Sequence, residues 1–234
     1  MNKEQIKQIK NEYKDKSPQE ILKFAISEFG DHLKIASSLG VEDQVITQMA
    51  TQINASVKVF VLDTGRLHQE TYDVLDQTRQ AYSVNYEVYF PKAESVESLL
   101  QEKGPNSFYQ SIENRKECCG IRKIEPLKRA LSTAKAWVTG LRQSQSVTRA
   151  ALPIIEWDEA HGLVKVNPLA TWSEEDVWAY VKEHNVPTNR LHKQGFPSIG
   201  CSPCTRAIKE GEDVRAGRWW WESLDQKECG LHSK

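Results

Sequence analysis

The chain has 234 residues, 39% of them hydrophobic and 27% charged, and is therefore long enough to bury one full-sized core. Its 31 lysines and arginines nearly balance 32 aspartates and glutamates, so nothing in the overall charge favours nucleic acid or a membrane surface as a partner. The first residues, MNKEQIKQIKNEYK, lack the apolar core of a signal peptide, and no run approaches the roughly 20 apolar residues of a membrane span. We therefore expect a cytoplasmic protein whose five cysteines stay reduced and serve metal binding or catalysis.

Helices and strands are predicted to alternate along the chain. Ser17, Pro18 and Glu20 form the pattern that begins a helix, and Gly30 marks its end. The expected helices are 17–30, 41–54, 68–82, 96–101 and 173–185, and the expected strands lie within 32–40, 57–65, 85–90 and 136–141. This alternation predicts an α/β fold with a parallel sheet and helices on both faces.

The end of the chain differs in composition from the rest. Residues from about Asn189 onward are charged, loop-like and rich in cysteine, and no repeat or low-complexity linker separates them from what precedes. We expect a nucleotide-binding α/β domain over residues 1–188, which carries part of the cysteine site, and a C-terminal arm of the same domain over 189–234.

Two segments follow expected strands at the edge where ligands bind in such sheets. In SSLGVED, the hydroxyls of Ser37 and Ser38 and a helix N-terminus suit a phosphate or sulfate group, although an ordinary capped turn has the same composition. In LDTGRLHQET, Asp63 and Thr64 end a buried strand, and they suit either a ligand or a helix cap.

Four of the five cysteines form two pairs. Cys118 and Cys119 are adjacent, whereas Cys201 and Cys204 have the C-x-x-C spacing of a metal site. Zinc ligands are normally two to four residues apart, and adjacent residues project too differently to share one tetrahedral ion. Neighbouring thiolates can instead bind different irons of a four-iron cluster, so the pattern favours an iron-sulfur cluster over zinc.

Several segments together resemble the thioredoxin-dependent sulfonucleotide reductases of sulfate assimilation, specifically the cluster-containing adenosine 5'-phosphosulfate (APS) reductases. The resemblance rests on CCGIRK, GCSPC, GRWWWE and KECGLH, and, in order along the chain, on SSLGVED, LDTGRLHQETY and GLRQSQSVTR. It spans about residues 37–232 and implies an adenine nucleotide α-hydrolase-like fold with a catalytic C-terminal arm. SSLGVED lacks the paired glycines of the related ATP pyrophosphatase loop, which argues against ATP activation chemistry.

The resemblance also implies roles for the cysteines. The two cysteine pairs would ligate a [4Fe-4S] cluster, and Cys229 would be the nucleophile that attacks the sulfur of APS and expels AMP. Reduced thioredoxin would then release sulfite by thiol attack on the Cys229 thiosulfonate. A position five residues from the C-terminus suits a thiol that must meet a macromolecular partner, although a tail cysteine by itself is more often a spectator.

Cationic side chains are expected to hold the substrate. Lys123 lies about one helical turn beyond Cys119, Arg142 follows a strand at the binding edge, and Arg215 and Arg218 resemble the arginines with which the family grips phosphate and sulfate. Taken alone, each is more often a solvated surface charge. The three tryptophans at 219–221 suit stacking on adenine, and better suit packing of the arm onto the core.

Four other functions fit parts of this pattern. The chain could reduce 3'-phosphoadenosine 5'-phosphosulfate (PAPS), or accept both nucleotides. From another class, it could be a non-catalytic iron-sulfur sensor or a zinc-stabilised binding module, but neither needs Cys229 or the Arg215 and Arg218 pair. The sequence is compatible with a homo-oligomer.

Overall fold

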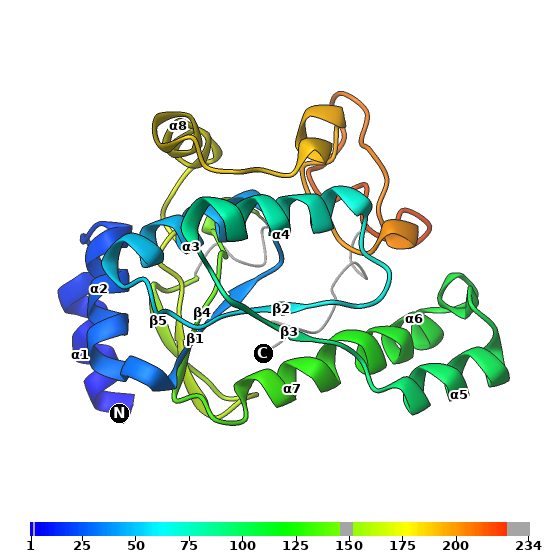
Figure 1. The fold of residues 1–234 in the computed structure, drawn as a ribbon, viewed down its shortest axis with the longest axis horizontal. Helices are drawn as coiled ribbons and strands as arrows, with labels where there is room; N and C mark the ends of the chain where they lie inside the picture. The colour runs from blue at the N-terminus through cyan, green and yellow to red at the C-terminus, as the bar shows by residue number, and fades with distance from the viewer. Residues whose placement is uncertain (2, 146–151, 224–234) are drawn as a thin grey trace. The chain divides into compact units, whose positions relative to one another are not determined.

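The computed structural model describes residues 1, 3–145 and 152–223 (Figure 1). No helix within these residues is long and apolar enough to cross a membrane. The helices are α1 (Lys3–Tyr13), α2 (Pro18–Phe29), α3 (Val41–Ile53), α4 (Gln69–Tyr82), α5 (Ala93–Lys103), α6 (Ile112–Cys119), α7 (Glu125–Leu131) and α8 (Glu174–His184). The strands are β1 (Leu33–Ser37), β2 (Val59–Leu62), β3 (Tyr86–Tyr89), β4 (Ala136–Val138), β5 (Ile155–Asp158) and β6 (Leu163–Val166).

The strands form one six-stranded sheet in the order β3-β2-β1-β4-β6-β5. β1 pairs in parallel with β2 and β4, and β4 pairs in parallel with β6. β5 is the exception, because it pairs with β6 as an antiparallel edge strand. The predicted α/β fold with a mostly parallel sheet and flanking helices is therefore confirmed, with one antiparallel edge.

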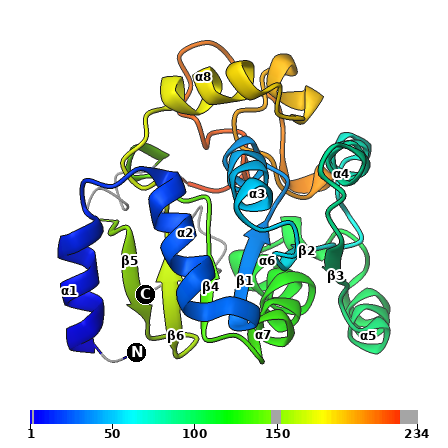
Figure 2. The same ribbon diagram turned by 60° about the vertical axis from the view of Figure 1, so that its left-hand side comes forward.

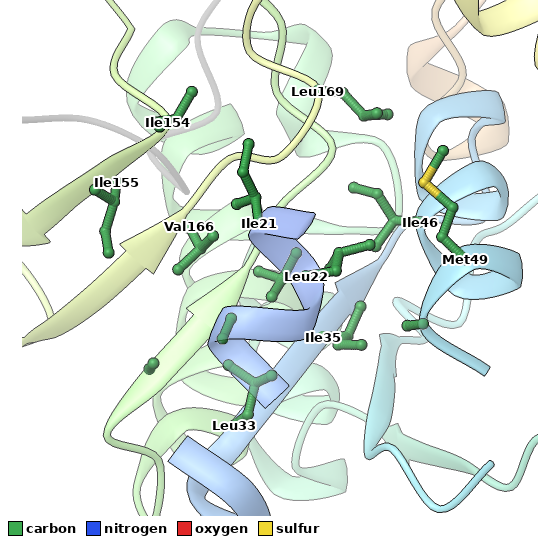
Figure 3. Packing of buried hydrophobic residues seen from close by; sticks show 14 of the residues in the cluster. Ile21, Leu22, Leu33, Ile35, Ile46, Met49, Ile154, Ile155, Val166 and Leu169 are labelled. Carbon is green, nitrogen blue, oxygen red and sulfur yellow. The ribbon is translucent and has the colours of Figure 1, made fainter. Parts of the chain in front are cut away.

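α2 begins with the capping residues that the sequence predicted. The Ser17 side chain accepts from the Glu20 N–H while the Glu20 carboxylate accepts from the Ser17 N–H, so both cap donors are satisfied. Ile21 and Leu22 then point into the core, where they lie near Ile46 and Met49 of α3 (Figure 3). α2 and α3 lie side by side next to β1, as Figure 2 also shows.

The β5–β6 hairpin was not predicted from the sequence, and its residues explain why. β6 is only four residues long and carries a lysine in its middle, so it lacks an unbroken apolar run. In the structure all four residues are buried, because the Lys165 ammonium lies 5.4 Å from the centre of the Trp137 ring and 3.8 Å from the Glu156 carboxylate. A buried lysine needs an aromatic or anionic partner of this kind, and the residues next to Lys165 in the sequence do not reveal one.

The chain groups into two compact units. The first consists of Met1–Val61, Asp73–Glu87 and Leu131–Asn189, and the second of Leu62–Tyr72, Val88–Ala130 and Arg190–Lys234. The main hydrophobic core belongs to the first unit. The division into a domain over 1–188 and an arm over 189–234 stays a prediction.

Candidate active site

The two cysteine pairs line one cavity in the second unit. α6 ends at Cys118 and Cys119, and the other pair frames a short 3₁₀ turn, η7 (Ser202–Cys204), where the Cys204 N–H donates to the Cys201 carbonyl over 2.9 Å. All four face a cavity with about 400 Å³ of empty volume, partly open to solvent. Residues more than 80 positions apart in the sequence thus meet at one place.

The helix that carries Cys118 and Cys119 does not continue as a regular α-helix. After Cys119 it widens into a π-helical segment, η3 (Gly120–Ile124), in which the Glu125 N–H donates to the Gly120 carbonyl five residues earlier. Lys123 still lines the cavity with the cysteines. Lys123 and the cysteines thus face the same cavity, and a π turn rather than the expected α turn separates them.

Positive charge surrounds the cysteines. Five cationic side chains line the cavity, with no carboxylate among the described residues that line it. They are Arg66, Arg115, Arg122, Lys123 and Arg218. Such a wall suits anionic groups such as thiolates, phosphate or sulfate.

The thiols also affect one another. Burial, followed by the charges of the other three cysteines, raises the pKa of the Cys204 thiol to about 12. The Lys123 ammonium opposes this by lowering the pKa of Cys204. Burial likewise raises the pKa of Cys118, while the Arg122 guanidinium lowers it. The four sulfur atoms therefore lie within electrostatic range of one another and of the cavity's cations.

Asp63 and Thr64 form the turn beside this cavity. Asp63 Oδ1 accepts from the Gly65 N–H over 2.8 Å and from the Tyr72 hydroxyl over 2.9 Å, which is a turn-forming role and differs from the helix cap that the sequence offered. Thr64 Oγ1 lies 3.3 Å from the Cys201 sulfur. The Thr64 carbonyl accepts from Arg122 Nη1 over 2.7 Å, so this turn is bonded both to a cysteine and to a cation of the cavity.

Arg218 reaches the cavity over a glycine. Its guanidinium lies 4.8 Å from the centre of the Trp219 ring and donates to the Ser198 hydroxyl over 3.3 Å. A Cβ at Gly200 would clash with that guanidinium, so Gly200 leaves the space that Arg218 occupies. Arg215 is not among the residues that line the cavity, and its backbone N–H donates to the Asp213 carboxylate.

Ser37, Ser38 and Arg142 belong to the first unit, where each bonds to other residues of that unit. The Ser38 N–H and hydroxyl donate to Asp43 Oδ2 over 2.7 and 2.6 Å, and Ser37 Oγ accepts from the Leu39 N–H. Burial raises the pKa of Asp43 to about 6. The hydroxyls that the sequence offers to a ligand therefore also organise their own loop.

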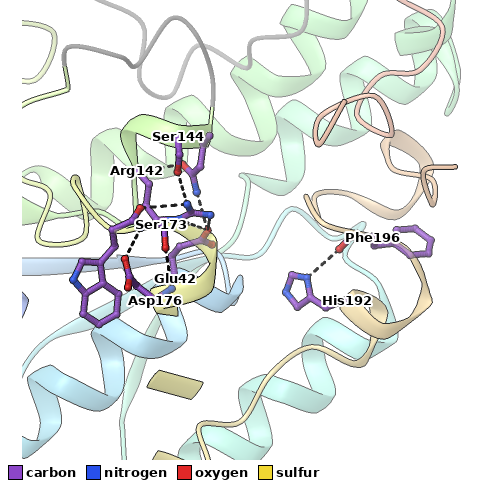
Figure 4. A network of polar contacts seen from close by, with 9 residues as sticks. Glu42, Arg142, Ser144, Ser173, Asp176, His192 and Phe196 are labelled. Atoms are coloured by element: carbon purple, nitrogen blue, oxygen red, sulfur yellow. Dashed lines mark hydrogen bonds and ion pairs between the residues drawn. The ribbon is translucent and has the colours of Figure 1, made fainter. Parts of the chain in front are cut away.

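Arg142 is paired with the residue before Asp43. Its Nε and Nη2 donate to Glu42 Oε1 over 3.0 and 2.9 Å, as Figure 4 shows. Glu42 also accepts from Gln145 Nε2 over 3.0 Å, so a single carboxylate holds the segment after β4 against the N-terminus of α3. Figure 4 also shows His192 of the second unit, whose Nδ1 lies 3.0 Å from the Phe196 carbonyl.

Cys229 and residues 146–149 of the GLRQSQSVTR segment lie outside the described residues. The predicted role of Cys229 therefore rests on the sequence.

Sequence reasoning missed three cations of the cavity. Arg122 follows Cys118 by four positions, the same spacing that singled out Lys123 after Cys119, so that argument applied to both. Arg66 stands in the quoted segment LDTGRLH and lies 4.9 Å from the Phe108 ring centre. Arg115 carries no such signal, because its partners come from the far end of the chain.

Comparison with known proteins agrees with this description. Residues 32–207 match the family model of the phosphoadenosine phosphosulfate reductase domain. The chain is 55% identical over 207 residues to an adenosine 5'-phosphosulfate reductase of Burkholderia cepacia, covering 88% of this chain and 83% of that protein.

Solved structures show the same fold. A phosphoadenylyl-sulfate reductase from Candida auris, crystallised as a phosphate complex, matches with a TM-score of 0.76 and 32% identity over 89% of this chain and 98% of its own. An FMN adenylyltransferase from Candida glabrata matches with a TM-score of 0.56 and 15% identity over 90% of this chain and 73% of its own, and shows similarity of fold alone.

Proposed function

Because the chain belongs to the phosphoadenosine phosphosulfate reductase family, we propose that it reduces APS to sulfite and AMP with electrons from reduced thioredoxin. The enzyme is an oxidoreductase that acts on a sulfonucleotide in sulfate assimilation, on the way to cysteine. A relative at 55% identity over most of both chains carries the name of this activity, which favours APS over PAPS as the substrate.

The observation that carries the proposal is the cavity at which four cysteines meet five cations. Its donor set consists of thiols, which as thiolates are the usual ligands of iron-sulfur clusters. Arg122 Nε is a buried donor with no hydrogen-bond partner in the described part of the chain. Because buried donors are normally hydrogen-bonded, this N–H suits an anionic ligand in the cavity.

We assign the cluster to Cys118, Cys119, Cys201 and Cys204. A [4Fe-4S] cluster held there would supply iron–thiolate bonds that join α6 to the η7 turn. The cations on the wall would balance the negative charge of the thiolates and remain close enough to attract the sulfate group of APS.

The chemistry itself belongs to Cys229 and the cations. The Cys229 thiolate attacks the sulfur of APS, a sulfur–sulfur bond forms, and the sulfur–oxygen bond to phosphate breaks as AMP leaves with the electron pair. A phosphate leaving group needs no general acid, so Lys123 and Arg218 act by positioning and stabilising charge. A thioredoxin thiolate then attacks the Cys229 sulfur and displaces sulfite, and a second thioredoxin thiol resolves the mixed disulfide.

Sulfite release from APS and from PAPS, measured side by side with reduced thioredoxin, tests the proposal. We expect sulfite and AMP in equal amounts from APS. Release from PAPS alone would select the PAPS reductase alternative. Release from neither nucleotide by protein that contains iron would favour the sensor, and protein with zinc but no iron would favour the binding module.

A further inference from the structure

A buried ion pair in the second unit joins the cysteine helix to the end of the described chain. Arg115 Nε donates to Glu222 Oε1 over 3.0 Å, and Arg115 Nη2 donates to Glu222 Oε2 over 2.7 Å. The two side chains are only 1% and 4% exposed. Two parallel bonds in this fork geometry fix orientation as well as distance.

Arg115 stands where it can transmit that orientation to the site. It lies one turn before Cys118 and Cys119 on α6, and its own side chain lines the cysteine cavity. Its guanidinium lies 4.8 Å from the centre of the Trp219 ring, the same distance at which Arg218 lies from that ring. The two arginines and the tryptophan therefore form one continuous part of the cavity wall.

Glu222 closes the turn that follows Trp219. The Glu222 N–H donates to the Trp219 carbonyl over 2.8 Å, and the Trp219 N–H donates to the Cys204 carbonyl over 3.1 Å. Trp219 has a φ of 41°, a conformation that a bulky residue adopts only when its surroundings impose it. Between them, these contacts tie the turn to both cysteine pairs.

The position of Glu222 in the sequence suggests a role for these contacts. Cys229 follows it by seven residues, a length that spans at most roughly 25 Å when fully extended. The place from which those residues start therefore limits where the Cys229 thiol can go. No functional argument from sequence had singled out either Arg115 or Glu222.

We infer that Glu222 is a positioning residue, which through Arg115 fixes the start of the segment that delivers Cys229 to the sulfate group of APS. The inference rests on the proposed function. The bonds of Arg115 hold the turn against the helix of Cys118 and Cys119, so the nucleophile is delivered relative to the same helix that presents Lys123.

Glu222→Gln removes the charge and keeps the size of the side chain. At saturating APS we expect thiosulfonate formation on Cys229, followed by intact mass in a single turnover, to slow by about tenfold or more. AMP affinity and iron content should stay near those of the wild type. Hydrogen exchange at the Trp219 and Glu222 amides should become faster.

The matched control is Glu212→Gln, which breaks another two-bonded pair of the same unit, that between Glu212 and Arg206, away from the cavity. It should leave both the rate and the exchange unchanged. An unchanged rate or unchanged exchange in Glu222→Gln would overturn the inference. A wild type that forms no thiosulfonate would refute the proposed function instead. The exchange measurement would still test whether the Arg115–Glu222 ion pair holds the turn in place.

The double variant Arg115→Met/Glu222→Leu distinguishes loss of positioning from the destabilisation caused by burying an arginine without its carboxylate partner. Replacing a buried ion pair by apolar residues of similar size is often neutral for stability, whereas removal of one partner is not. We expect the double variant to fold and to remain about as slow as Glu222→Gln. Recovery of the wild-type rate would show that the single variant suffered only from an unpaired Arg115, and would also overturn the inference.

Discussion

At the scale of single residues, the site depends on which charges stand beside the sulfur atoms. Lys123 lines the cysteine cavity, and its ammonium lowers the pKa of Cys204. It therefore lies within electrostatic range of the proposed cluster ligands, where the sulfate group of the proposed substrate would also contact it. A lysine on a solvated helix face would have neither property.

Lys123→Ala should remove a charge-assisted contact worth roughly 1.5 to 3 kcal/mol. This corresponds to a loss of about one to two decades in the rate of thiosulfonate formation. Iron content should not change, because no ligand is touched, and AMP should bind almost as before, because it carries no sulfate. A single-turnover rate with saturating APS that equals the wild-type rate would remove Lys123 from the site.

Asp43 provides a prediction about pH. Burial raises the folded-state pKa of its carboxyl from 3.8 to about 6, with nearby Glu42 adding to the effect and the Ser38 bonds opposing it. A raised folded pKa means that the unfolded state releases its proton first, so folding stability falls as the pH rises from about 4 to about 6. Asp43 should account for up to about 3 kcal/mol of that fall.

Asp43→Asn should flatten the pH dependence of stability in this window. Asn cannot ionise, so the variant's denaturant midpoint should change less between pH 4 and pH 6 than that of the wild type. Equal slopes in the two proteins would show that the carboxyl does not titrate there.

At the scale of elements, two glycines of the second unit make contrasting contacts. A Cβ at Gly200 would meet the end of the flexible Arg218 side chain, whereas a Cβ at Gly217 would meet the backbone carbonyl of Arg206. A side chain can move away at little cost, but a backbone group cannot. The same substitution should therefore act on function at one site and on folding at the other.

Gly200→Ala should keep a near-normal denaturant midpoint but lower kcat/KM for APS by roughly tenfold, because Arg218 is displaced from the cavity. Gly217→Ala should lower the midpoint itself. Normal kinetics in Gly200→Ala would mean that Arg218 does not need its place over this glycine.

The elements also show what the sequence could and could not predict. Helices with strong local signals, such as α2 with its capping box, were placed within one residue. The four cysteines and Lys123 were found from spacing alone. The β5–β6 hairpin was missed because a lysine interrupts the apolar residues of β6. Arg115 and Glu222 were missed because each depends on a buried partner that is distant in sequence.

At the scale of the whole molecule, most of the sheet belongs to the first compact unit, whereas the residues that line the cysteine cavity belong to the second. The sheet carries a large apolar core of its own. The cavity of the second unit is lined mainly by cysteines and cationic side chains, so the proposed cluster would bond elements of that unit to one another. The second unit should therefore depend on the proposed cluster for stability more than the first.

Cys204→Ser should lose iron and increase hydrogen exchange in α6 and around residues 201–206, while the amides of β1, β4 and β6 stay protected. Conservation of four irons per chain in this variant would contradict the assigned ligands. Equal loss of protection in both units would contradict the division of stability between them.

The most direct test of the whole account follows Cys229 through one turnover. Wild-type protein mixed with APS in the absence of thioredoxin should release one AMP per active chain and gain the mass of one SO₃ group on the peptide that contains Cys229. Reduced thioredoxin should then discharge that group as sulfite, and Cys229→Ser, with normal iron content, should do neither. Sulfite production by Cys229→Ser, or an adduct on any other cysteine, would contradict the account.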